Sequence, residues 1–186
     1  MIDEKLKLYN ILMEVKKIRK QKISDFINKD WDTFLLQCAL LNPQSYGATI
    51  EKKFIVDNNL RKNKSSDNIG DVYNSLLDRN YEIKASYLSK DNTYNLVQIR
   101  SWQDVDYYIM LIDISDEKVN KTLFILSHQE MCYEIENYGD NAHGTKSILK
   151  ENNKVEKRLT LTNNDIERWK KMYYHQDDFI LRDKNE

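Results

Sequence analysis

The chain has 186 residues, of which 32% are charged and 40% are hydrophobic, and its 29 Lys and Arg against 30 Asp and Glu give a formal net charge of −1. This length predicts one domain and excludes a second large catalytic domain. The apolar stretches are far shorter than the roughly 20 residues that cross a bilayer, and the charged N-terminus lacks the core of a secretory signal. We therefore expect a soluble, cytoplasmic protein with no membrane partner.

The distribution of charge indicates the kind of partner, and the spacing of the two cysteines indicates whether they form a disulfide or a metal site. Residues 1–29 and 144–171 each hold eight Lys and Arg against four Asp and Glu, and residues 52–64 hold five against one, whereas residues 104–140 hold nine acids against two Lys. Such segregation is typical of a protein that binds a polyanion and also holds cations, although solvated surfaces produce similar runs. The cysteines have no neighbours at metal-ligand spacing, so we expect buried thiols rather than a disulfide or a zinc site.

Three helices are expected in the first third of the chain. Apolar residues at three- and four-residue steps over 8–18 predict the first helix, whose other face is rich in Lys. A second apolar stripe over 31–41 follows Asp30, a good N-cap residue. The third helix places Glu51 beside its own apolar stripe rather than opposite it. We assign residues 1–42 to an N-terminal helical subdomain.

A sheet is expected after the polar, basic loop at 58–67. Segments rich in Tyr, Ile, Val and Leu predict five strands, at 71–76, 81–87, 94–100, 107–114 and 122–127. The fourth is apolar for most of its length, as in a central strand covered on both faces. Further elements are predicted as a helix at 128–137, a long loop at 139–157, a strand at 158–162 and a helix capped by Thr162. Residues 43–186 are thus expected to form an α/β domain with a mixed central β-sheet flanked by helices.

One group of charged residues indicates chemistry. Alternate residues of a strand share a face, so Glu82 and Lys84 are expected to project together from the second strand. A hairpin turning at 78–80 brings Asp71, at the start of the preceding strand, alongside Glu82. Two carboxylates this close are unfavourable unless a cation lies between them, and oxygen ligands select a hard ion such as magnesium.

This arrangement resembles the PD-(D/E)XK nuclease superfamily, whose motif matches Gly70-Asp71 and the EIK triplet at 82–84, with Glu51 on the upstream helix. The resemblance implies that Asp71, Glu82 and Glu51 hold Mg²⁺, with Mn²⁺ able to substitute. It also implies that Lys84 orients or deprotonates the attacking water. Ile69-Gly70 replaces the proline that gives the motif its name, which many members of the superfamily also lack.

The segments SYGATIE at 45–51, VQIRSW at 97–102 and AHGTK at 142–146 make the chain look like a small bacterial type II restriction endonuclease. This resemblance implies a restriction-endonuclease-like core, followed by a C-terminal DNA-recognition loop and helix. The segment 101–106 is short for the helix that would cross between two parallel strands, which leaves the strand order open.

Several polar side chains are candidates for contacts with DNA. On the third strand, Gln98 is a candidate to hold a metal-bound water or a phosphate. Basic residues near the site are candidates for phosphate contacts, namely Lys52, Lys53, Arg61, Lys62 and Lys64. Polar residues of the long loop are candidates for contacts with base edges, namely Asn141, His143, Thr145 and Lys146.

The expected function is magnesium-dependent hydrolysis of double-stranded DNA at a short specific sequence. We expect a homodimer, with the first or second helix as interface, because a two-fold dimer reads a palindromic site. A DNA methyltransferase is the expected functional partner. The alternatives are a repair, phage or structure-specific nuclease, a noncatalytic DNA-binding protein on the same scaffold, and an interaction protein in which Glu82 and Lys84 merely pair on a surface.

Overall fold

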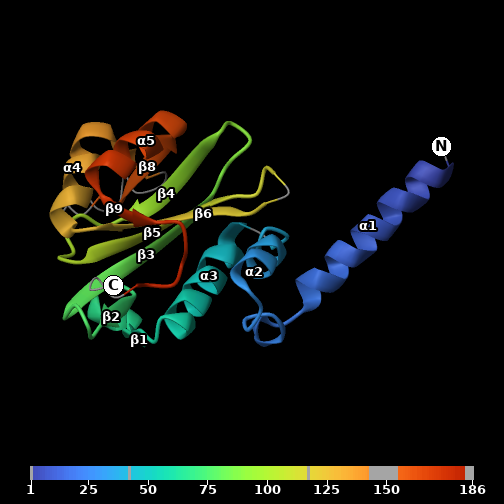
Figure 1. Cartoon of the computed structure of the whole chain (residues 1–186), viewed down its shortest axis with the longest axis horizontal. Coiled ribbons are helices and arrows are strands. Elements are labelled where there is room, and N and C mark those ends of the chain that lie inside the picture. Colours follow the sequence, from blue (N-terminus) through green and yellow to red (C-terminus); the bar gives the residue numbers. More distant parts are fainter. Residues whose placement is uncertain (1, 42, 117, 143–154, 183–186) are drawn as a thin grey trace.

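The computed structural model describes residues 2–41, 43–116, 118–142 and 155–182, and Figure 1 shows how they are arranged. Two β-sheets and the helices that cover them form the body, and α1 (Ile2–Lys20) projects away from this body. Within the described ranges, no helix combines the length and the apolarity that crossing a membrane requires.

The central sheet has six strands in the order β1-β2-β3-β5-β6-β9. Their bounds are β1 Arg61–Lys62, β2 Val72–Asn74, β3 Arg79–Tyr87, β5 Asp106–Asp113, β6 Asn120–Leu126 and β9 Tyr174–Gln176. The β3 and β5 strands run parallel, and the other neighbouring pairs are antiparallel. The predicted mixed central sheet flanked by helices is therefore confirmed.

The β5 strand is buried on both faces, as its apolar sequence predicts. Alternate side chains of a strand point to opposite faces, and here they enter two separate cores. Tyr108, Met110 and Ile112 pack with apolar residues of α2 (Trp31–Cys38) and α3 (Pro43–Asp57). The intervening residues pack with a second sheet and with α4 (His128–Tyr138) and α5 (Asn163–Met172).

Of the N-terminal helices, α2 packs against the body of the protein and α1 projects away from it. The α2 helix begins after Asp30, whose carboxylate accepts a hydrogen bond from the backbone N–H of Thr33 at 2.9 Å. Its apolar residues Trp31, Phe34 and Leu35 lie in the same core as the central sheet. A short 3₁₀ helix, η1 (Ile23–Asp25), precedes it. Of the region predicted as a helical subdomain, only α1 therefore stands apart from the body.

The predicted third strand lies in a different sheet from the one expected. It is β4 (Thr93–Ile99), and it pairs antiparallel with β8 (Lys157–Thr162), which also pairs with β7 (Asp140–Asn141). Parallel neighbours such as β3 and β5 need a long connection that leaves the sheet. Residues 88–105 provide this connection through β4 instead of through a helix, and this settles the strand order that the short segment 101–106 left open. The short strands β1, β7 and β9, and a 3₁₀ helix η2 (Ser65–Asp67), were also not predicted.

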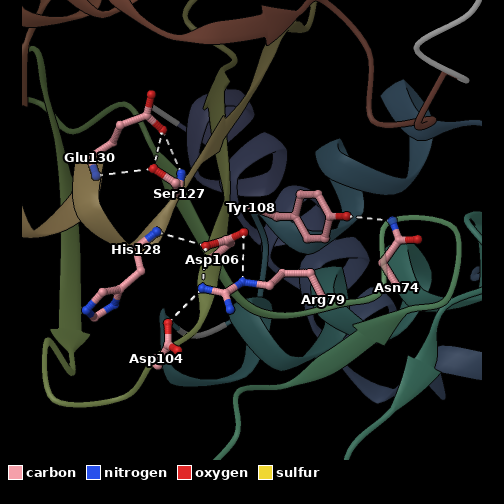
Figure 2. A network of polar contacts seen from close by, with 8 residues as sticks. All are labelled: Asn74, Arg79, Asp104, Asp106, Tyr108, Ser127, His128 and Glu130. Atoms are coloured by element: carbon pink, nitrogen blue, oxygen red, sulfur yellow. Dashed lines mark hydrogen bonds and ion pairs between the residues drawn. The ribbon is translucent and has the colours of Figure 1, made fainter.

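Figure 2 shows a polar network that holds β3, β5 and α4 together. The guanidinium of Arg79 binds the carboxylate of Asp104 at 2.7 Å and that of Asp106 at 3.2 Å. Asp106 also accepts a hydrogen bond from the backbone N–H of His128, the first residue of α4, at 2.8 Å. These contacts join the starts of two parallel strands to a helix, and they thereby support the β3 register on which the site depends.

The ends of α4 and α5 follow sequence signals. Ser127 and Glu130 form a reciprocal capping box at the start of α4, and Thr162 caps α5 in the same way, as predicted. The thiols differ in burial, because Cys38 is fully buried whereas Cys132 is partly exposed, with Sγ 3.4 Å from His128 Nε2. The expectation of two buried thiols is therefore correct only for Cys38.

Candidate active site

Asp71 is fixed at the entrance to β2 by a tight turn against β3. Gly70 has φ +83°, and a Cβ there would lie 2.7 Å from the carbonyl oxygen of Tyr81. Only glycine adopts this conformation and tolerates this approach without strain. The backbone N–H of Asp71 donates to the same carbonyl at 2.8 Å, and Asp71 Oδ2 accepts from the backbone N–H of Ile83 at 2.8 Å. Both the backbone and the carboxylate of Asp71 are thus bound to the edge of β3.

Asp71 lies beside Glu82, as the sequence predicts. The β2 and β3 strands pair antiparallel with Val72 opposite Tyr81, and continuing this register by one residue places Asp71 opposite Glu82. The connecting turn differs slightly from the prediction, because it occupies 75–78 rather than 78–80. Hairpin pairing therefore brings together two carboxylates that are eleven residues apart in the sequence.

Glu82 and Lys84 form a largely buried ion pair on one face of β3. Lys84 Nζ lies 2.7 Å from Glu82 Oε1, and their side chains are 14% and 8% exposed. Ile83, between them, points into the core on the other face. The alternation that the sequence predicts is therefore present. This burial does not fit the alternative of a simple surface ion pair, because exposed pairs contribute little and their carboxylates are solvated.

The pKa of Asp71 reflects its burial and the negative charges around it. Burial, together with the negative charges of Glu82 and Glu51, raises the pKa of the Asp71 carboxyl from 3.8 to about 6. The hydrogen bond from the Ile83 N–H and the positive charge of Lys84 act in the opposite direction, but they do not compensate. A carboxyl that resists ionisation in this way is a typical feature of a functional site.

Glu51 reaches the same site from α3, the helix that precedes β1 in the chain. Its Oε1 atom lies 3.0 Å from Lys62 Nζ of β1, and its side chain is 20% exposed. The structure thus brings together four predicted residues, Asp71, Glu82, Lys84 and Glu51, and adds Lys62, which the sequence predicted only as a phosphate contact. The ten residues between Glu51 and Lys62 contain no signal that would predict this pairing.

The donor set of the site fits a hard divalent cation. Its oxygens come from three carboxylates, with no thiolate or imidazole among them, and this favours magnesium or manganese. The raised pKa of Asp71 indicates that additional positive charge would stabilise the ionised site. Within the described ranges, no three His, Cys, Asp or Glu side chains are already grouped as metal ligands. Lys84 and Lys62 each bind one carboxylate oxygen that a shared cation would need.

One predicted DNA contact is wrong. Lys53 is only 3% exposed, and its Nζ donates to the carbonyl oxygen of Ile27 at 2.8 Å and pairs with Asp57 at 2.9 Å. The ammonium also lies over the ring of Trp31, 5.0 Å from its centroid. Because these partners enclose the ammonium in the core, Lys53 cannot contact a phosphate.

The other predicted phosphate contacts are on the surface. Lys52 on α3 and Lys64 after β1 are exposed, and the exposed Arg61 has its guanidinium carbon 4.4 Å from the centroid of the Tyr73 ring. The sequence missed Asn63, whose side-chain amide donates to Asn80 Oδ1 at 3.0 Å. These positions place a basic strand and loop next to the segment that carries Asp71.

The remaining candidates lie in or near the second sheet. Gln98 is exposed in β4, with φ +55° at an irregularity of the β4–β8 pairing, and its backbone belongs to a different sheet from Asp71 and Glu82. Asn141 in β7 accepts a hydrogen bond from Lys157 Nζ at 2.9 Å. The predicted base contacts His143, Thr145 and Lys146 lie outside the described residues.

Comparison with known proteins adds no identification. No protein-family model matches the chain, and no curated protein is similar enough to it to be a relative. The functional assignment therefore depends on the geometry and chemistry of the site.

Proposed function

We propose that the protein is a magnesium-dependent endonuclease that hydrolyses phosphodiester bonds of double-stranded DNA. The observation that carries this proposal is the convergence of Asp71, Glu82 and Glu51 with Lys84, accompanied by the raised pKa of Asp71. Hydrolysis of a phosphodiester requires a water nucleophile and positive charge near the scissile phosphate. Three carboxylates and an ammonium meet these requirements when a divalent cation is held among them.

Each residue has a distinct part in the proposed reaction. Asp71, Glu82 and Glu51 would hold the cation, which when bound polarises a phosphoryl oxygen and lowers the pKa of water. The ammonium of Lys84, which Glu82 holds at 2.7 Å, would stabilise negative charge that develops on the phosphate and orient the water. The backbone N–H of Ile83 keeps the Asp71 carboxylate in place.

The finer proposal is a type II restriction enzyme that cuts at a short specific sequence and is paired with a DNA methyltransferase. The segments 45–51, 97–102 and 142–146 resemble those of small bacterial type II restriction endonucleases, and this resemblance supports the finer proposal. The alternative within the same chemistry is a repair, phage or structure-specific nuclease. A noncatalytic DNA-binding protein is less well supported, because Asp71, Glu82, Lys84 and Glu51 are all present and the charges of the other three act on Asp71.

Incubation of the purified protein with long duplex DNA, with and without Mg²⁺, tests the proposal. We expect discrete fragments that require Mg²⁺, whereas a smear would support the repair or phage nuclease. Asp71→Ala, Glu82→Ala and Lys84→Ala should each abolish cleavage, while the matched control Lys90→Ala, an exposed lysine in the turn after β3, should retain it. Cleavage that persists in purified Asp71→Ala would contradict the assignment.

We also propose that the protein acts as a homodimer through α1. Of the two helices predicted as the interface, α2 is the less suited, because all its large apolar side chains except Leu36 are buried within its own chain. The apolar residues of α1 include Leu8, Ile11 and Leu12, which are 61%, 52% and 49% exposed. Antiparallel pairing of two copies covers them and keeps the two Lys-rich helix ends apart.

Mass measurement in solution tests the dimer. The unchanged protein should have twice the mass of one chain, and Ile11→Glu, which puts a charge in the middle of the exposed apolar face, should have the mass of a single chain. Val56→Glu, at a similarly exposed position on α3, is the matched control and should remain dimeric. A monomeric unchanged protein at working concentration would contradict this part of the proposal.

A further inference from the structure

Lys62 places a positive charge on one carboxylate of the proposed cation site. Its Nζ lies 3.0 Å from Glu51 Oε1, and the side chains of Lys62 and Glu51 are 66% and 20% exposed. The pair joins β1 to α3, so it is not a contact between neighbours on one helix. A lysine in this position occupies an oxygen that a cation shared with Asp71 would also use.

The backbone fixes where Lys62 can reach. In the pairing of β1 with β2, Lys62 is opposite Val72, the residue that follows Asp71. The next residue, Asn63, donates its backbone N–H to the carbonyl oxygen of Asp71 at 2.9 Å. The strand that carries the ammonium is therefore tied to the strand that carries the central carboxylate.

The charges of the site leave one carboxylate without a cationic partner. Glu82 pairs with Lys84 and Glu51 pairs with Lys62, whereas Asp71 forms no ion pair within the described part of the chain. With all groups ionised, three negative charges face two positive charges. The site is one positive charge short, so a divalent cation balances its charge if it displaces one of the two lysines from a carboxylate.

The two lysines differ in how easily a cation can displace them from their carboxylate partners. The Lys84 side chain is 14% exposed and would lose its partner in a largely buried environment, which is costly. Lys62 extends into solvent, where an ammonium is well hydrated and an exposed ion pair is weak. Lys62 is thus the ammonium that a cation displaces at little cost.

We propose that Lys62 competes with the divalent cation for Glu51, and that this competition sets the cation concentration at which the site fills. Lys62 is then a positioning residue, which holds Glu51 beside the site until the cation arrives. This inference rests on the proposed function, because it concerns the same cation site.

Binding of Mn²⁺ to the protein without DNA, measured by electron paramagnetic resonance of the free ion, tests the proposal. Lys62→Met should bind Mn²⁺ about two- to five-fold more tightly than the unchanged protein, which is the effect expected of removing an exposed ion pair. Lys62→Arg keeps the charge and should restore the original affinity. Lys64→Met removes another exposed lysine that has no described carboxylate partner, and it should change the affinity less.

The possible outcomes separate this inference from the proposed function. If the unchanged protein binds Mn²⁺ and Glu51→Gln weakens binding, the cation site is supported. Equal affinities of Lys62→Met and Lys64→Met would then overturn the role of Lys62 alone. If the unchanged protein binds no Mn²⁺, both the proposed cation site and this inference are overturned. Because the Lys62 side chain is mostly exposed, its replacement is expected to leave the fold intact.

Discussion

Replacement of Asp71 by asparagine should make the protein more stable at neutral and alkaline pH while it removes activity. The pKa of Asp71 is raised from 3.8 to about 6, chiefly by burial and then by the charge of Glu82. A carboxyl with a raised pKa binds more protons in the folded chain than in the unfolded chain. The free energy of unfolding therefore falls as the pH rises from about 4 to about 6, and it stays lower above that range.

The size of the effect follows from the two pKa values. The difference between 3.8 and about 6 corresponds to about 3 kcal/mol at pH 8. Glu82 and Glu51 share this unfavourable charge with Asp71, so we expect Asp71→Asn to gain about 1 to 3 kcal/mol. The amide oxygen of asparagine can still accept the hydrogen bond from the Ile83 N–H, so the turn is expected to persist.

Urea unfolding at pH 5 and pH 8 measures this prediction. The gain of Asp71→Asn over the unchanged protein should be larger at pH 8 than at pH 5 by about 1 kcal/mol, because the carboxyl is mostly protonated at the lower pH. Asp91→Asn, an exposed acid in the turn between β3 and β4, is the control and should show no such dependence. A variant that loses the same stability at both pH values would refute the argument that Asp71 carries an unfavourable charge.

Two further predictions concern residues that support the site. Gly70→Ala should lower the free energy of unfolding by about 1 to 3 kcal/mol, because the residue has φ +83° and its Cβ would meet the backbone of β3. Gly47→Ala, in α3 with open space around the Cβ, is the control and should raise the free energy of unfolding by about 0.5 to 1 kcal/mol. Thermal or urea unfolding measures both variants. Lys53→Ala should destabilise the fold by about 1 to 3 kcal/mol, since it leaves a partly buried carbonyl and a partly exposed carboxylate without their partner, and should not affect DNA affinity through lost phosphate contacts. Lys52→Ala should weaken duplex binding in a salt-dependent way without changing stability. If instead Lys52→Ala lowers stability and Lys53→Ala weakens duplex binding, burial does not determine which of the two lysines supports the fold and which contacts DNA.

Local patterns were sufficient to predict the parts of the site that depend on strand geometry. Glu82 and Lys84 share a face because alternate residues of any strand do, and Asp71 reaches Glu82 because a short turn determines the hairpin register. The turn lies two to three residues before its predicted position, and this difference does not change the outcome. The apolar β5 strand was also recognisable as central from its composition alone.

Features that depend on distant pairing were not predictable in this way. The β4 strand leaves the central sheet because it pairs with β8, whose paired residues lie 58 to 69 positions later, and its own sequence does not specify that partner. Lys53 shows a signal that was overlooked. It lies three residues after Ile50 and next to Phe54, so on a helix it adjoins the buried stripe, and Asp57 one turn later provides its counter-charge.

The same arrangement explains both the instability and the proposed function of the site. Asp71 is held by Gly70 and the edge of β3 where its charge is unfavourable, and the chain retains it there although asparagine would satisfy the same hydrogen bond. A cation that binds only the folded chain would offset this cost by mass action. Protons and a divalent cation would then compete for the same oxygens, so the charge that destabilises the site would also be the source of the affinity proposed for such an ion.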